Sequence, residues 1–116
     1  MSLCARLVER GKFSPACPDE LLENSYEEAL LLKNEAMGST TACIISLDTE
    51  ASKLYTANLG DSGYMVVRNG RILARSQEQQ HYFNSPFQLT LVPPAYRGRV
   101  LSDRYITHFG RGDNLV

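Results

Sequence analysis

The sequence predicts an α+β fold in which N-terminal helices pack with an antiparallel β-meander. Three observations support this fold class. Apolar residues follow helical spacing in the first part of the chain, the spacing changes to period two from Gly38, and an Asn69-Gly70 dipeptide separates two short apolar stretches. Asn-Gly favours the type I′ turn of a tight hairpin, so the stretches on either side of it are expected to pair as antiparallel strands.

Two segments have the patterns of helices. The first covers residues 2–10, which place apolar side chains on one face before a glycine that ends the helix (Leu3, Cys4, Leu7, Val8 and Gly11). The second opens at Pro18, because proline suits the first helical turn and the acids behind it suit the positive end of the helix dipole. A capping box at Ser25-Tyr26-Glu27-Glu28 is an alternative start for this helix.

Four strands are predicted, over residues 39–47, 53–59, 64–68 and 71–75. In the first of them both alternate sets of residues are apolar or small, which predicts a strand covered on both faces. Its Cys43 is expected to be a small buried hydrophobe.

The remainder of the chain is less regular. "TLVPP" predicts a short strand, Arg97 to Asn114 has the composition of a loop, and "NLV" at the end resembles the beginning of another strand.

Composition restricts the possible functions. The 116 residues make one domain or part of one, with a charged fraction of 22% and a net charge of −1. This balance gives no reason to expect nucleic acid as a partner, and no apolar run is long enough to span a bilayer. The three cysteines are odd in number and lack C-x-x-C spacing, which fits a reducing compartment rather than a zinc site.

The segment Gly60-Asp61-Ser62-Gly63 is the sharpest candidate site. In one interpretation it is a glycine-rich turn whose aspartate bonds backbone amides. In the other, Asp61 is a carboxylate presented at a hairpin junction to a hard cation such as Mg²⁺ or Mn²⁺. A single carboxylate does not make such a site, so the second interpretation requires ligands from elsewhere.

Other polar residues favour structural roles. His81 and His108 have no neighbour at ligand spacing and are expected in loops. Ser39-Thr40-Thr41 lacks both a nucleophile elbow and a P-loop lysine. Three arginines flank the predicted hairpin, where a solvated strand face is favoured over contact with phosphate (Arg68, Arg71 and Arg75).

The segments "MGSTTACIISLD" and "KLYTANLGDSGYMVVRNGRI", in this order, resemble the type 2C (PPM) protein phosphatases, which are metal-dependent protein serine/threonine phosphatases. "SQEQQHYFNSPFQL", the Leu101-Ser102-Asp103 stretch and the helical "LCARLVERGKF" are similar to the mitochondrial branch of that family. The resemblance covers nearly the whole chain. It implies an αββα sandwich, in which two antiparallel sheets pack face to face with helices outside.

The resemblance also implies a chemistry. In this family a binuclear Mn²⁺ or Mg²⁺ centre activates a water molecule that attacks a phosphoserine or phosphothreonine of a protein substrate. It implies a mitochondrial location, with a cytoplasmic one as the alternative because no targeting segment is visible. This sequence departs mildly from the family pattern at Gly63, where members of the family often have arginine or another residue.

Only Asp61 matches a metal position of the family, that of an accessory third cation. The principal ligands lie in Asp-Gly and Asp-Asn contexts, and this chain has no Asp-Gly dipeptide. Its Asp113-Asn114 is interpreted as part of a turn before a later strand and is not assigned. No residue is therefore given a catalytic or cofactor-binding role.

We accordingly expect residues 1–116 to be an internal part of a phosphatase catalytic domain, truncated at both ends and inactive alone. The alternative is a catalytically inactive phosphatase-like protein that acts as an interaction module.

Overall fold

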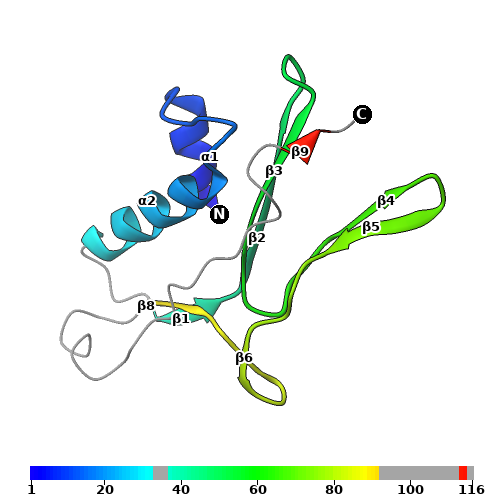
Figure 1. Ribbon diagram of the computed structural model, residues 1–116. Helices are drawn as coiled ribbons and strands as arrows, with labels where there is room; N and C mark the ends of the chain where they lie inside the picture. The colour runs from blue at the N-terminus through cyan, green and yellow to red at the C-terminus, as the bar shows by residue number, and fades with distance from the viewer. Residues whose placement is uncertain (33–36, 92–112, 115–116) are drawn as a thin grey trace.

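The computed structural model describes residues 1–32, 37–91 and 113–114. Helices α1 (Ser2–Glu9) and α2 (Pro18–Leu31) come first along the chain and lie on one side of the strands (Figure 1). The strands are β1 (Gly38–Thr40), β2 (Ala42–Asp48), β3 (Lys53–Leu59), β4 (Met65–Arg68), β5 (Arg71–Arg75), β6 (Gln80–Tyr82), β7 (Ser85–Pro86), β8 (Leu89–Leu91) and β9 (Asp113–Asn114). Neither described helix is long and apolar enough to cross a membrane.

Both helices form where the sequence predicts them. After α1, Gly11 adopts a φ of 73°, and the amides of Gly11 and Lys12 bond back to the carbonyls of Val8 and Leu7. This is a Schellman motif, which needs a residue in the left-handed conformation that glycine adopts without strain. The alternative start of α2 at Ser25 is wrong. Ser25 lies buried inside the helix and donates its Oγ hydrogen to the Leu21 carbonyl at 2.7 Å.

The predicted strands form two antiparallel hairpins. β2 pairs with β3 from Ala42↔Leu59 to Asp48↔Lys53, and β4 pairs with β5 around Asn69-Gly70. Asn69 and Gly70 have φ values of 52° and 75°, so the two-residue type I′ turn is confirmed.

The two hairpins do not continue into one four-stranded meander. β3 pairs with β9, while β4 and β5 form a separate sheet that points away from the helices (Figure 1). The separation begins at Gly60, whose φ of 100° redirects the chain after β3.

The first predicted strand is broken at Thr41 into β1 and β2. β1 leaves the β2–β3 sheet and pairs with β8, from Gly38↔Leu91 to Thr40↔Leu89. β8 covers the start of the strand predicted in "TLVPP", whose residues 92–94 lie outside the described residues.

Near the C-terminus, β9 contradicts the predicted loop at residues 113–114, while residues 97–112 of that loop are outside the described part of the chain. Of the strand expected in "NLV", only Asn114 is described, and it belongs to β9.

The core lies between the helices and one face of the β2–β3 hairpin. One buried cluster joins α2 to three strands, and a second joins the two helices (Leu22, Ala42, Leu59 and Leu89; Cys4, Leu7 and Leu21). Ile44 packs against both clusters, which ties the helix pair to the hairpin. Each buried leucine contributes roughly 1.5–3 kcal/mol through the hydrophobic effect.

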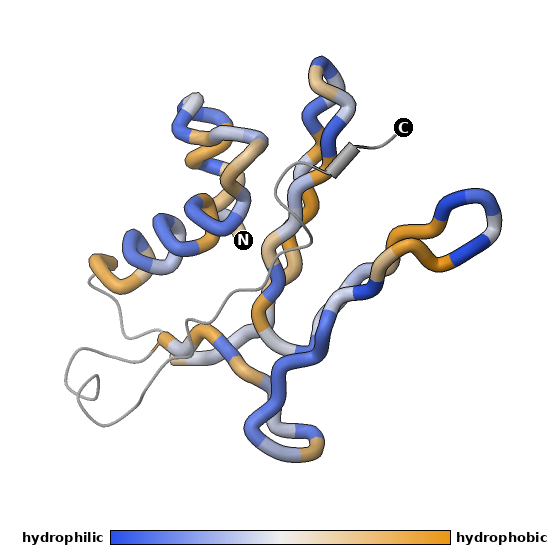
Figure 2. Tube along the Cα trace, viewed as in Figure 1, coloured by the Kyte–Doolittle hydropathy of each residue, from blue (hydrophilic) through white to orange (hydrophobic). Residues whose placement is uncertain are grey.

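The opposite face of β2 corrects a prediction. Ile45 and Leu47 are 51% and 58% exposed, so this strand is not covered on both faces. Cys43 lies on the same alternate set and is half-buried, and desolvation raises the pKa of its thiol. Apolar residues therefore remain at the surface of β2 and of the β4–β5 hairpin. Figure 2 shows the hydrophobic stretches along both hairpins.

Gly60 has the least space of the glycines in the turns. A methyl group added there would lie 2.6 Å from the Phe87 carbonyl oxygen and would overlap the Thr41 side chain. We predict that Gly60→Ala lowers the free energy of unfolding by about 2–4 kcal/mol, because it combines overpacking with an unfavourable φ. Urea unfolding measures this. Gly38→Ala is the control, since nothing lies within 4 Å of its added methyl; equal effects of the two variants would contradict the prediction.

Candidate functional site: the Asp61 turn

Asp61 lies in the connection between β3 and β4, as predicted, and its side chain is exposed. The backbone immediately before it is clamped by one buried residue. The backbone amide of Gly60 donates to the side-chain Oε1 atom of Gln79 at 2.7 Å, and the backbone amide of Gln79 donates to the Gly60 carbonyl at 3.0 Å. Asn58 adds a weaker bond from Nδ2 to the same carbonyl, at 3.5 Å. These bonds are shielded from water, which makes them costly to break.

The backbone after Asp61 is also held by its neighbours. The hydroxyls of Ser62 and Thr41 are hydrogen-bonded at 2.6 Å, which connects the turn to the break between β1 and β2. Farther along, the amide of Tyr64 donates to Ser76 Oγ at 2.9 Å, and the amide of Ser76 donates to the carbonyl of Tyr64 at 3.0 Å. The turn is thus fixed on both sides of Asp61.

The Asp61 carboxylate takes no part in this network. Within the described part of the chain no hydrogen bond or ion pair involves Asp61. The interpretation in which its side chain bonds the turn amides is therefore not borne out, because other residues hold the turn. The carboxylate remains available to a ligand from solvent.

A polar hollow of about 350 Å³ lies beside the turn. Its lining includes Asp61 and residues at and just after the C-terminal end of β5. Glu78 and Arg75 line this hollow with Asp61, so two carboxylates and one guanidinium share one space. Both Glu78 and Arg75 are exposed. Arg75 is the arginine of the predicted hairpin set that meets the candidate site, whereas Arg68 and Arg71 line a separate hollow at the hairpin end.

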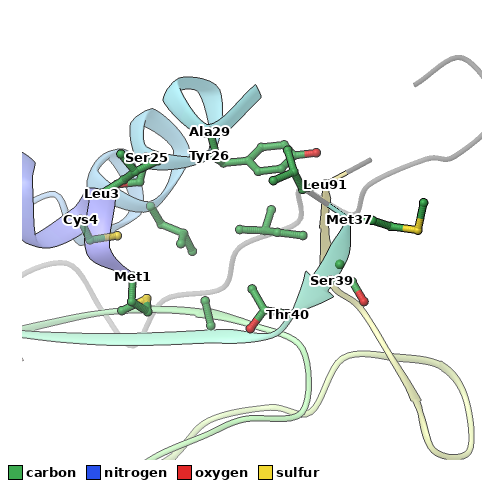
Figure 3. Close-up of a pocket in the computed structure, with 14 residues that line it drawn as sticks. Met1, Leu3, Cys4, Ser25, Tyr26, Ala29, Met37, Ser39, Thr40 and Leu91 are labelled. Atoms are coloured by element: carbon green, nitrogen blue, oxygen red, sulfur yellow. The ribbon is translucent and has the colours of Figure 1, made fainter. Parts of the chain in front are cut away.

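A second cavity, of about 300 Å³, is lined mainly by apolar side chains. It lies between the helices and the β1–β8 pair, with Tyr26 and Ala29 on one side and Thr40 on the other (Figure 3). Cys4 is the one thiol in its lining. The polar groups there are largely engaged, since Ser25 bonds within α2 and Ser39 donates to Gln88. The chemistry therefore points to the Asp61 hollow rather than to this cavity.

The described residues contain no group of three or more histidine, cysteine, aspartate or glutamate side chains that could hold a metal ion. Asp61 and Glu78 are two carboxylates that line one hollow, and they do not by themselves make such a group. His81 belongs to β6 and packs its ring 4.4 Å from that of Phe87, so it is not in the predicted loop. His108 lies outside the described residues.

Comparison with known proteins places the chain in a family. The family model described as Protein phosphatase 2C matches residues 6–85. The chain belongs to the protein phosphatase 2C family. Proteins named "Protein phosphatase PTC7 homolog" from Danio rerio and Homo sapiens are each 54% identical to it over 103 residues, or 89% of this chain. A Drosophila willistoni relative, "Protein phosphatase PTC7 homolog fig", is 45% identical over 104 residues, or 90% of this chain.

The chain spans about a third of the length of these phosphatase 2C relatives: 35%, 34% and 33%, respectively. A solved structure shares its fold: the photosystem II phosphatase PBCP matches all of this chain with 40% of its own, at a TM-score of 0.75 and 22% identity. The α+β fold predicted from the sequence is therefore confirmed as that of a phosphatase 2C segment.

Sequence inspection missed Glu78 and Gln79. Both lie in the polar run "SQEQQ", which carries no motif by itself. The available signal was the β4–β5 hairpin: a tight turn at Asn69-Gly70 returns the chain to its starting point, so residues just after β5 must come close to those just before β4. Counting outward from that turn would have placed residues 76–79 beside residues 60–64.

Gln79 should therefore control the order of the turn. We predict that Gln79→Ala costs about 1–3 kcal/mol of stability, because the buried Gly60 amide loses its acceptor. Amide hydrogen exchange at Gly60 should accelerate by more than exchange in α2. Gln77→Ala, at an exposed neighbouring position, is the control. Unchanged exchange at Gly60 in Gln79→Ala would show that the clamp does not hold the turn.

Proposed function

We propose that this chain is part of a metal-dependent protein serine/threonine phosphatase, which hydrolyses phosphoserine and phosphothreonine in protein substrates. One observation carries the proposal: the Asp61 carboxylate is exposed on a turn that other residues hold, so it is available for ligation. Membership of the protein phosphatase 2C family supports this use of the carboxylate.

We propose Mn²⁺ or Mg²⁺ as the cation, with Asp61 at an accessory site. Hard cations of this kind take oxygen ligands, and the two carboxylates of Asp61 and Glu78 supply that chemistry in one hollow. The remaining ligands would be water, substrate phosphate and carboxylates from other parts of the phosphatase domain. A bound cation would also relieve the repulsion between these two carboxylates, which line the hollow together with the guanidinium of Arg75.

The chain's own residues then have separable tasks. Gln79 and Gly60 fix the turn, so that Asp61 is held in place before any ligand arrives. Arg75 offers a guanidinium to the phosphate of a substrate, whose charge at neutral pH is about −1.5 to −2. When bound, the cations of this enzyme class activate water to attack phosphorus.

We further propose that residues 1–116 form one part of a longer phosphatase domain and that the whole protein works in mitochondria. The first proposal rests on the finding that the chain spans about a third of the length of its relatives. The second rests on the likeness of the "SQEQQHYFNSPFQL" segment to the mitochondrial branch. Subcellular fractionation of the full-length protein tests the location, and recovery in the cytosol alone would reject it.

Asp61→Asn should weaken metal-dependent turnover in the full-length protein while leaving its melting temperature unchanged. The amide keeps the shape of the side chain and removes the charge that a cation needs, so the Mn²⁺ concentration for half-maximal activity should rise roughly tenfold or more. Phosphate release measured across Mn²⁺ concentrations, together with a thermal melt, tests this. Glu50→Gln, an exposed acid in the β2–β3 turn, is the matched control. Equal metal dependence of the Asp61 variant and the unsubstituted protein would remove the accessory-cation role.

The 116-residue chain by itself should bind Mn²⁺ weakly and release no phosphate from a phosphopeptide. Its described residues offer no cluster of three metal-ligating side chains, and a metal-activated water needs closely spaced cations with several oxygen ligands each. Titration calorimetry with Mn²⁺ and a phosphate-release assay on the purified chain test this. Micromolar affinity, or turnover that a chelator abolishes, would show that a complete site exists within the chain.

A further inference from the structure

Two joints connect the segment that carries Asp61 to the segment after β5. The first joint is the pair of hydrogen bonds between Gly60 and Gln79. The second is made by Ser76, whose hydroxyl oxygen accepts the backbone amide of Tyr64 at 2.9 Å and donates to the Tyr64 carbonyl at 3.3 Å. The same carbonyl accepts the backbone amide of Ser76 at 3.0 Å. Ser76 thus continues the contact between β4 and β5 beyond the end of their ladder.

The two joints close a ring formed by residues 60–64 and residues 76–79. Asp61 and Glu78 belong to opposite segments of this ring, and both line the hollow. Each of them is three residues or fewer from either joint, so its backbone has little freedom to move away from the opposite segment. Both joints therefore limit the separation of the two carboxylates.

The lack of a side chain at Gly63 leaves room for the Ser76 hydroxyl. The φ of Gly63 is not positive, so its backbone conformation does not require glycine. A methyl group added there would overlap the Ser76 Oγ atom, whereas the Ser76 Cβ atom would lie 3.7 Å away, an ordinary contact distance. A side chain at position 63 would therefore compete for space with the hydroxyl alone.

We propose that Ser76 is a positioning residue of the phosphatase site, whose hydroxyl keeps the Asp61 and Glu78 segments together before a cation binds. This proposal rests on the proposed function. Residues that orient metal ligands without touching the metal are important for binding, and losing one typically costs roughly 10–100-fold in metal affinity. Ser76 suits this role because it bonds the backbone of the ring and leaves the Asp61 carboxylate available. A site that is ordered in advance binds its ligand without the cost of ordering it.

Ser76→Ala in the full-length protein tests the hydroxyl directly. Amide hydrogen exchange at Tyr64 should accelerate about tenfold in the metal-free protein, because this amide loses its acceptor. The Mn²⁺ concentration for half-maximal hydrolysis of para-nitrophenyl phosphate should rise about tenfold, while kcat at saturating Mn²⁺ stays unchanged. Gln77→Ala is the control, because Gln77 is an exposed neighbour that does not line the hollow.

Gly63→Ala tests the same hydroxyl from the other side of the contact, because the added methyl displaces it. This variant should reproduce both effects of Ser76→Ala. The Gly63→Ala, Ser76→Ala double variant should be no worse than either single variant, since the methyl then occupies the space that the hydroxyl has left. Gly38→Ala is the control for an added methyl, because nothing lies within 4 Å of it.

Three results would overturn the proposal. One is an unchanged half-maximal Mn²⁺ concentration in both single variants. Another is a fall in kcat that follows a loss of thermal stability at unchanged metal dependence, which would make Ser76 a structural residue only. The third is an additive effect in the double variant, which would show that Gly63 and the Ser76 hydroxyl do not share one space.

The proposed function and the positioning role fail differently. If the unsubstituted full-length protein releases no phosphate in the presence of Mn²⁺, the proposed function fails and the positioning role fails with it. If it is active and its metal dependence is the same in every variant, the phosphatase function stands and the positioning role alone is overturned.

Discussion

The candidate site depends on the close approach of the Gly60 backbone to the chain around it. Only a residue without a Cβ fits between Thr41 and the Phe87 carbonyl at a φ of 100°. That fit lets Gln79 bond both the amide and the carbonyl of Gly60. Gly60 therefore brings three segments to one point: the end of β3, the break between β1 and β2, and the segment after β5. Each of these contacts joins residues far apart in sequence, so they form only when the hairpins have folded.

This arrangement separates the residues that build the turn from the residue that it presents. In many turns an aspartate is needed to bond nearby amides, and its carboxylate is then occupied. Here Gln79, Ser62 and Ser76 provide the bonds, and Asp61 provides none within the described residues. A carboxylate held in this way is preorganised, because a ligand can bind it without first breaking protein contacts or ordering the backbone.

Local signals made most of the fold predictable. Pro18, Gly11 and Asn69-Gly70 each act through backbone dihedrals that depend on the residue itself, and the elements they bound formed as expected. Pairing between distant strands was less accessible. The separation of β4 from β3 and the pairing of β1 with β8 follow from the packing around Gly60, and no short window of sequence contains that packing.

The exposed face of β2 shows a different limit of sequence patterns. Alternating apolar residues predict that a face of a strand is suited to burial. They do not predict whether the residues that cover this face belong to the same segment of the chain. Ala42 and Ile44 find their cover in α1 and α2, whereas Ile45 and Leu47 remain at the surface.

The same limit applied to the site, where the resemblance indicated Asp61 but not Glu78 or Gln79. The resemblance could indicate Asp61 as a candidate metal ligand because a short motif carries it, Gly60-Asp61-Ser62. The residues that orient it are recognised only by their contacts. Gln79 is an ordinary polar residue in the sequence. In the structure it is buried, and its side-chain Oε1 atom accepts a hydrogen bond from the backbone amide of Gly60. Its backbone carbonyl also accepts the Phe87 amide, so Gln79 joins the Asp61 turn to the segment that follows the β6–β7 hairpin.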